Sequence, residues 1–164
     1  MKFYLSTNIN PVILMPENEA NNFVYELQCN PGGGAVRVIR GWKCPNYEAL
    51  HNEVAAALQF PGYYGENWDA MNECITDLAW MPAQWYLIHV NGVELILPED
   101  ETDFKIFLKV LHRAGLDFAH PESRGLSDAE AALSKPLNTI ISGSEEGLLR
   151  ARKALDLHDA GAAI

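Results

Sequence analysis

The sequence predicts an α/β domain built on a small parallel sheet with helices packed against it. From residue 35 onward the predicted strands and helices alternate along the chain, an order that favours parallel strands joined by helical crossovers. The run Trp85–Val90 (WYLIHV) is almost continuously apolar, which is typical of a strand covered on both faces, so we expect it at the centre of the sheet. With 164 residues, the chain is long enough to bury one substantial core.

The first 40 residues are interpreted as β-rich. Clusters of Asn, Pro and Gly separate four predicted strands, Phe3–Leu5, Val12–Leu14, Phe23–Leu27 and Ala35–Arg40. The last two could pair as a hairpin across Asn30–Gly34. That glycine-rich link lacks a following Gly-Lys-Ser/Thr and leads into a strand, so a loose turn is favoured over a phosphate-binding loop. Residues 1–34 are therefore predicted to form a β-rich extension packed on a domain spanning 35–157.

Two helices are predicted between residues 46 and 78. The first, Asn46–Leu58, has Asn46 as its cap and apolar residues at helical spacing, namely Tyr47, Leu50, Val54 and Leu58. A turn marked by Pro61, Gly62 and Gly65 leads to the second helix, which Asn67 caps. After the central strand, Asn91-Gly92 signals a turn before a further apolar run, Val93–Leu97.

The C-terminal third completes the alternation. A helix is predicted at Asp100–Ala114, stopped by Gly115, with a basic outer face consisting of Lys105, Lys109, His112 and Arg113. Residues 116–136 are loop-rich and resemble an insertion, with a short helix at Ser127–Leu133. A last strand at Leu137–Ser142 and a last helix at Ser144–Leu157 follow, and 158–164 form a tail.

Composition narrows the function classes. A net charge of −10 disfavours binding to nucleic acid or anionic membranes and favours basic partners. Three cysteines without CxxC spacing indicate neither a disulfide framework nor a zinc site, which fits a reducing cytoplasm. No secretory h-region and no run of membrane-spanning length is present in the sequence. We expect a cytoplasmic protein.

The second helix has an unusual division of faces. Its apolar side carries Trp68, Met71, Ile75 and Leu78, whereas Asp69, Glu73 and Asp77, here called the acidic ladder, recur at i, i+4 and i+8 on the other side. Such like-charge pairs weaken a helix by roughly 0.2–0.5 kcal/mol each. Only Asp69 lies where the helix dipole favours an acid. An acidic face beside two adjacent tyrosines expected to be exposed, Tyr63 and Tyr64, indicates a docking surface for a cationic partner, with at least one of the two as a contact residue.

Other chemistries fit the sequence less well. Asp69 and Glu73 lie one turn apart on a face expected to be exposed, so neither is set up as the buried acid that a glycosidase pair requires. The histidines show no metal-ligand spacing, and Cys74 sits in an acidic helix that disfavours a reactive thiolate. We therefore expect no enzyme activity and no cofactor. A merely solvated polar face stays open as the simpler interpretation of the ladder.

The stretch FPGYYGENWDAMNECITDL resembles the signature of the barstar family, the intracellular inhibitors of barnase-like ribonucleases. The matching positions are Leu58, Pro61, Tyr63-Tyr64-Gly65-Glu66-Asn67, Asp69-Ala70, Cys74 and Thr76. The likeness extends more weakly over roughly residues 36–115. It implies a three-stranded parallel sheet flanked by helices, to which this chain adds the N-terminal segment and a C-terminal helix.

The resemblance also implies a mechanism, in which the acidic helix and the preceding tyrosine loop block the ribonuclease active site and imitate RNA phosphates. By position, the contacts would be Tyr63, Gly65, Asn67, Asp69 and Glu73, and the ladder adds Asp77. The partner would be a basic ribonuclease or a related toxin, and the chain an immunity protein.

Some positions depart from the family pattern. Glu73 stands where the family's best-known member has an Asp, and Asn72 and Leu78 stand where it has tryptophans. A later acidic contact residue of the family falls near Val110 in this sequence. These changes alter the outline of the binding surface. They leave a second interpretation open, a binding or regulatory module that keeps the fold and has a non-nuclease partner.

Overall fold

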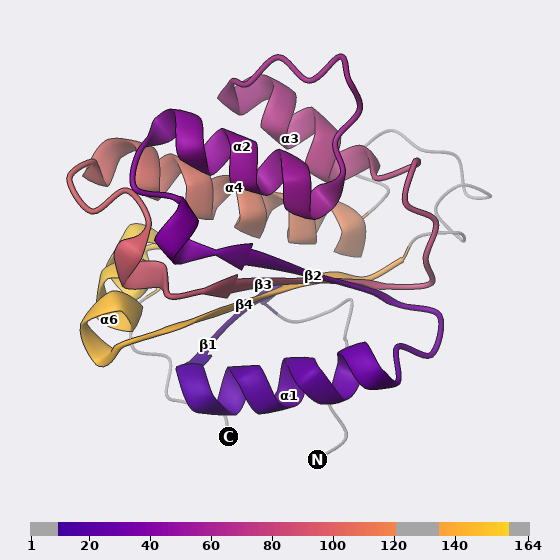
Figure 1. Ribbon diagram of the computed structural model, residues 1–164, viewed down its shortest axis with the longest axis horizontal. Coiled ribbons are helices and arrows are strands. Elements are labelled where there is room, and N and C mark those ends of the chain that lie inside the picture. Colours follow the sequence, from indigo (N-terminus) through magenta and orange to yellow (C-terminus); the bar gives the residue numbers. More distant parts are fainter. Residues whose placement is uncertain (1–9, 121–134, 158–164) are drawn as a thin grey trace.

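A computed structural model describes residues 10–120 and 135–157 and shows a four-stranded, fully parallel sheet (Figure 1). The strands are β1 (Val12–Pro16), β2 (Ala35–Arg40), β3 (Tyr86–Asn91) and β4 (Leu137–Gly143), in the order β1-β4-β3-β2. The prediction of an α/β fold is confirmed, but the expected number of three strands is wrong. The fourth strand, β1, comes from the N-terminal segment and pairs with β4.

Five helices of the described chain surround the sheet: α1 (Glu17–Cys29), α2 (Tyr47–Leu58), α3 (Trp68–Asp77), α4 (Glu101–Ala119) and α6 (Glu145–Ala154). Figure 1 shows α2, α3 and α4 on one face, α1 on the other and α6 at one end of the sheet. The larger core lies beneath α2, α3 and α4 and includes fully buried Leu50, Ile75 and Phe104. A smaller core joins α1 to the opposite face through Val24 and Leu87.

The predicted strand Phe23–Leu27 and its hairpin are wrong, because this segment lies within α1. Ala20 and Val24 are buried at i and i+4, and Leu27 is packed against the same small core at i+7. The helical period therefore explains the burial better than strand alternation does. The chain turns through residues 30–34 and enters β2, whose backbone pairs with β3.

The turn at Asn91-Gly92 does not begin a hairpin. Val93–Leu95 forms a short 3₁₀ turn, and β3 is already flanked by β2 and β4, so no open edge is left for a returning strand. The apolar residues in this run fill the core instead, since Val93, Ile96 and Leu97 are all buried.

Helix α4 runs through Gly115 to Ala119, so the predicted stop at Gly115 is also wrong. An added Cβ at Gly115 would lie 2.3 Å from the Cβ of Pro11, which shows that this glycine permits a close approach to the chain before β1. The glycine serves packing and not termination.

Residues 116–119 of the predicted loop-rich insertion 116–136 are helical and belong to α4, and 121–134 lie outside the described residues. The predicted central strand and the two predicted asparagine caps are confirmed. Strand β3 lies centrally and is buried along its whole length. The side-chain oxygens of Asn46 and Asn67 cap α2 and α3 by accepting hydrogen bonds from the backbone N–H groups of Ala49 and Ala70. The predicted elements Phe3–Leu5 and Ser127–Leu133, and the tail 158–164, lie outside the described residues. The division into an extension 1–34 and a domain 35–157 stays a prediction.

Candidate partner-binding site

The tyrosine loop, residues 59–67, joins α2 to α3 and is shaped by its own backbone. Helix α2 ends at Leu58, and its C-cap Gln59 turns the chain with a φ of 54°. The Tyr64 N–H then closes a turn by donating to the Pro61 carbonyl at 3.0 Å. Asn67 then acts at two points, since its Oδ1 accepts from the Ala70 N–H at 2.9 Å and its Nδ2 donates to the Gly65 carbonyl at 3.1 Å. One side chain thus starts α3 and holds the end of the loop.

The six residues predicted to contact a partner are all exposed. Tyr63 has 74% of its surface exposed, and the acidic ladder lies on the solvent side of α3. A hollow of about 240 Å³ lies between the loop and α3, and its lining includes Tyr63, Glu73 and Asp77. Gly65, Asn67 and Asp69 lie outside that lining, at the start of the helix. Whether these residues bind a partner stays a prediction.

Tyr64 differs from its neighbour because it points inward. Its hydroxyl group shares a hydrogen bond with Nδ1 of His51, a fully buried residue of α2. Its ring packs edge-on against Phe60, with 4.7 Å between the ring centroids. Burial raises the pKa of the Tyr64 phenol, whereas burial lowers the pKa of His51. Tyr63 is therefore the more exposed of the two tyrosines, and Tyr64 attaches the loop to α2.

Helix α3 is attached to α4 by a second polar contact. The Trp68 indole Nε1 donates to Oδ1 of Asp103, which lies in the first turn of α4, at 3.1 Å. His51 and Asp103 were not predicted as part of the site. His51 could have been found from the sequence, because it follows Tyr47 by four residues and so lies on the same, buried side of the predicted helix. Asp103 could not have been found in this way, because its contact is with Trp68, 35 positions earlier in the chain.

The basic residues of α4 are partly compensated within the chain. Lys105 and Lys109 lie 3.6 and 3.2 Å from the carboxylate oxygens of Asp156, which follows α6. Their hydrogen bonds and charges lower the pKa of Asp156, led by the bond from Lys109. All three side chains are well exposed, so these pairs add little stability. Two of the four residues on the predicted basic face, both lysines, are therefore engaged with an acid next to α6.

Two further chemistries considered for the sequence, a metal site and a carboxylate pair at Asp69 and Glu73, can be compared with the described residues. Across residues 10–120 and 135–157, no group of three or more His, Cys, Asp or Glu side chains could hold a metal ion. Asp69 and Glu73 are both exposed, whereas a glycosidase pair needs one carboxyl group in an apolar setting. Within the same ranges, no helix is long and apolar enough to cross a membrane.

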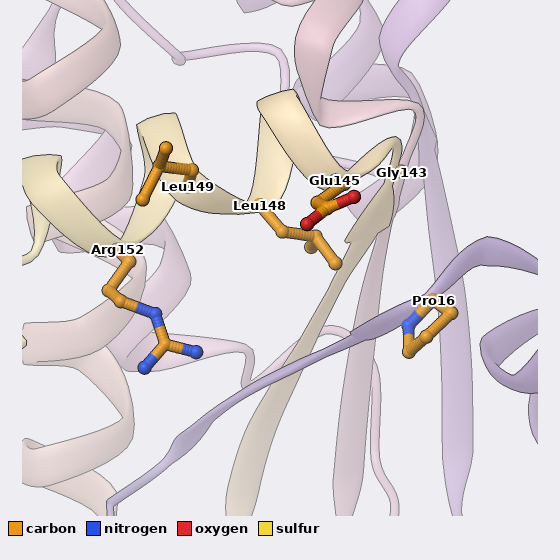
Figure 2. Close-up of a pocket in the computed structure, with 6 residues that line it drawn as sticks. All are labelled: Pro16, Gly143, Glu145, Leu148, Leu149 and Arg152. Carbon is orange, nitrogen blue, oxygen red and sulfur yellow. The ribbon is translucent and has the colours of Figure 1, made fainter. Parts of the chain in front are cut away.

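A second hollow, of about 480 Å³, lies at the carboxyl ends of β1 and β4 (Figure 2). Its lining consists of Pro16, Gly143, Glu145, Leu148, Leu149 and Arg152. Near the start of α6 two N–H groups are already paired, since the Ser144 N–H donates to Oε2 of Glu94 at 3.1 Å and the Gly147 N–H donates to Oγ of Ser144 at 3.2 Å. Of these two hollows, the loop hollow combines an exposed tyrosine with two carboxylates.

A parallel α/β domain with an exposed acidic helix beside an exposed tyrosine belongs to the class of domains suited to binding a basic protein. The family model described as "Barstar (barnase inhibitor)" matches residues 34–142, so this chain belongs to the barstar family, whose members are inhibitors and not enzymes. A protein of Bacillus subtilis (strain 168) named "Putative ribonuclease inhibitor YrdF" is 40% identical over 45 residues, covering 27% of this chain and 50% of that protein. The matched region thus spans about half the length of this curated relative.

Proposed function

We propose that this protein is a cytoplasmic immunity protein that inhibits a basic ribonuclease by covering its active site with α3 and the tyrosine loop. The observation that carries the proposal is the exposed acidic ladder beside Tyr63, within the segment that matches the barnase-inhibitor family. The proposed contacts are Tyr63, Gly65, Asn67, Asp69, Glu73 and Asp77.

The chemistry follows from what a ribonuclease must bind. An enzyme that holds RNA presents cationic side chains to phosphates, and carboxylates on a rigid helix offer negative charges to the same groups. The net charge of −10 also draws a basic protein toward the inhibitor over distances comparable to the Debye length. Binding would be stoichiometric and would need no cofactor.

The departures from the family pattern bear on which nuclease fits. Leu78 is fully buried and forms the C-cap of α3, so this position offers no contact surface. Glu73 lines the loop hollow together with Tyr63, where its longer side chain can reach farther than an Asp. These features change the shape of the proposed binding surface and therefore bear on which basic ribonuclease fits it.

Inhibition by single variants tests the proposal. Asp69→Ala should raise the inhibition constant for the partner ribonuclease by tenfold or more, because a charge-assisted contact contributes roughly 1.5–3 kcal/mol. Glu19→Ala is the matched control, since Glu19 is an exposed acid in the first turn of α1, on the opposite face of the sheet (Figure 1). Glu101 is less suitable, because it forms an ion pair with Arg150 at 2.6 Å.

Purified barnase and other small basic nucleases are the enzymes to assay, at low and high salt. Raising the salt concentration should slow association of the wild-type pair. Equal effects of Asp69→Ala and Glu19→Ala would contradict the proposed site. Inhibition of no ribonuclease, together with recovery of a neutral protein from the source cell in a stable complex, would favour the regulatory-module interpretation.

A further inference from the structure

Four side chains form a continuous connection beneath the proposed binding surface, here called the brace: Asp103, Trp68, His51 and Tyr64. Asp103 on α4 accepts a hydrogen bond from Trp68 on α3, and the Trp68 ring centroid lies 4.9 Å from that of His51 on α2. His51 in turn is hydrogen-bonded to Tyr64 of the tyrosine loop. The brace therefore joins three helices to the loop.

Most of the brace is withdrawn from solvent. His51 is completely buried, and the other three side chains are half-buried. A buried indole N–H requires an acceptor, and within the described contacts of Trp68 the acceptor is the Asp103 carboxylate. Since ionised acceptors form the stronger hydrogen bonds, this link holds the first turn of α3 against α4 more firmly than apolar packing alone would.

Tyr47 supports the same arrangement from the side. Its ring centroid lies 4.2 Å from that of His51 and 5.5 Å from that of Trp68. Its hydroxyl group donates to the Glu66 carbonyl at 3.2 Å, and Glu66 has a φ of 49°, an uncommon conformation for a residue with a side chain. The residue that precedes the Asn67 cap is thus held by a side chain from α2.

We propose that Asp103 is a positioning residue for the partner-binding site, and that it acts through Trp68 to fix the start of α3 and the tyrosine loop. This inference rests on the proposed function and adds to it a residue of α4 that is not itself a contact. Rigid placement matters because the ladder and Tyr63 must meet a partner without first paying the entropy of ordering the loop. The brace supplies that order in the free protein.

Asp103 could instead act through its charge on the partner, and two substitutions separate these roles. Asp103→Asn keeps a side-chain oxygen that can accept the indole N–H but removes the charge. Asp103→Ala removes both. Trp68→Phe removes the donor and keeps an aromatic ring. Glu99→Ala is the control, because Glu99 is an exposed acid shortly before α4 and its loss is the same change in charge.

Amide hydrogen exchange in the free, full-length protein provides the first test. The amides to follow are those of Tyr64, Ala70 and Met71, which are hydrogen-bonded within the loop and the first turn of α3. Asp103→Ala and Trp68→Phe should each lower their protection about tenfold, while Asp103→Asn and Glu99→Ala stay within about twofold of wild type. The Thr139 amide of β4 should not change. Unchanged protection in both Asp103→Ala and Trp68→Phe would overturn the brace.

Binding kinetics with barnase as the probe provide the second test. Asp103→Ala and Trp68→Phe should raise the dissociation rate about tenfold, Asp103→Asn should restore it to near the wild-type value, and combining Asp103→Ala with Trp68→Phe should add little. Equal losses for Asp103→Asn and Asp103→Ala would assign Asp103 a charge role and overturn the positioning role. If the wild-type protein does not bind barnase, the proposed function fails for that enzyme, and amide exchange still decides whether the brace exists.

Discussion

His89 should make the stability of this protein depend on pH in mildly acidic solution. The side chain lies in the central strand β3 with 1% of its surface exposed, and its Nε2 is 2.8 Å from Oγ of Ser142 on β4. Burial lowers its pKa to about 4, against an ordinary value of about 6.5. Burial is the only resolved cause, so no charged neighbour is expected to offset it.

The sign and size follow from linkage. Because His89 has the lower pKa when folded, the unfolded chain takes up the proton first as pH falls, and the free energy of unfolding decreases between about pH 6.5 and pH 4. A difference of about 2.5 pKa units corresponds to about 3 kcal/mol in total, of which about 2 kcal/mol is lost between pH 7 and pH 5. Above about pH 7 none of this stability is lost, and below about pH 4 little more of it is lost.

Urea unfolding at pH 7 and pH 5, followed by tryptophan fluorescence, measures the effect. His89→Gln cannot be protonated, so its stability should fall by about 2 kcal/mol less than that of the wild type over this range. His51 and His112 also have lowered pKa values and contribute equally in both proteins, so the difference isolates His89. Parallel losses in the two proteins would refute the reasoning. If the variant does not fold, the His89 ring titration followed by NMR should still show a midpoint near pH 4.

Two further predictions concern the cap of α3 and the thiols. Asn67→Ala should lower the free energy of unfolding by about 1 kcal/mol in urea titrations, while Asn67→Asp, which keeps the acceptor for the Ala70 N–H, should retain most of it; equal losses would exclude the cap. At pH 8 a thiol reagent should modify exposed Cys29 first, because Cys44 is buried with its pKa raised to about 12 and burial also raises the pKa of Cys74. Simultaneous reaction of all three thiols would contradict the burial.

The parts of the fold that were predicted correctly are those coded by neighbouring residues. Helix caps at Asn46 and Asn67 and the apolar run of β3 depend on side chains within a few positions, and each was found. The errors arose where the structure is determined by contacts between segments far apart in the sequence. Glycine is the residue type that often ends a helix, but Gly115 lies inside α4, where the absence of a side chain allows close packing against Pro11.

The same distinction explains which parts of the candidate site were predicted. The exposed ladder could be read from spacing on one helix, and the structure does expose it. The inward orientation of Tyr64 could not be read, because it depends on His51, 13 residues earlier in the chain. Adjacent identical residues, Tyr63 and Tyr64, therefore take opposite roles that the sequence alone does not separate.

Asp77 offers a direct test of whether the acidic ladder exists for binding. It is the last residue of α3, where the helix dipole disfavours an acid, and Glu73 lies one turn before it. Asp77→Asn should therefore raise the free energy of unfolding by roughly 0.3–1 kcal/mol. It should at the same time weaken inhibition of the ribonuclease, because Asp77 lines the loop hollow beside Glu73.

The combination of outcomes discriminates between the two interpretations of this face. If the face is merely solvated, Asp77→Asn should raise the free energy of unfolding and leave inhibition of the ribonuclease unchanged. If the face binds a partner, Asp77→Asn should lower the affinity for the ribonuclease while it raises the free energy of unfolding. This is the trade-off expected where charge is retained for recognition. Urea titration and an inhibition assay on the same variant therefore decide the question, and unchanged inhibition by Asp77→Asn would remove Asp77 from the proposed site.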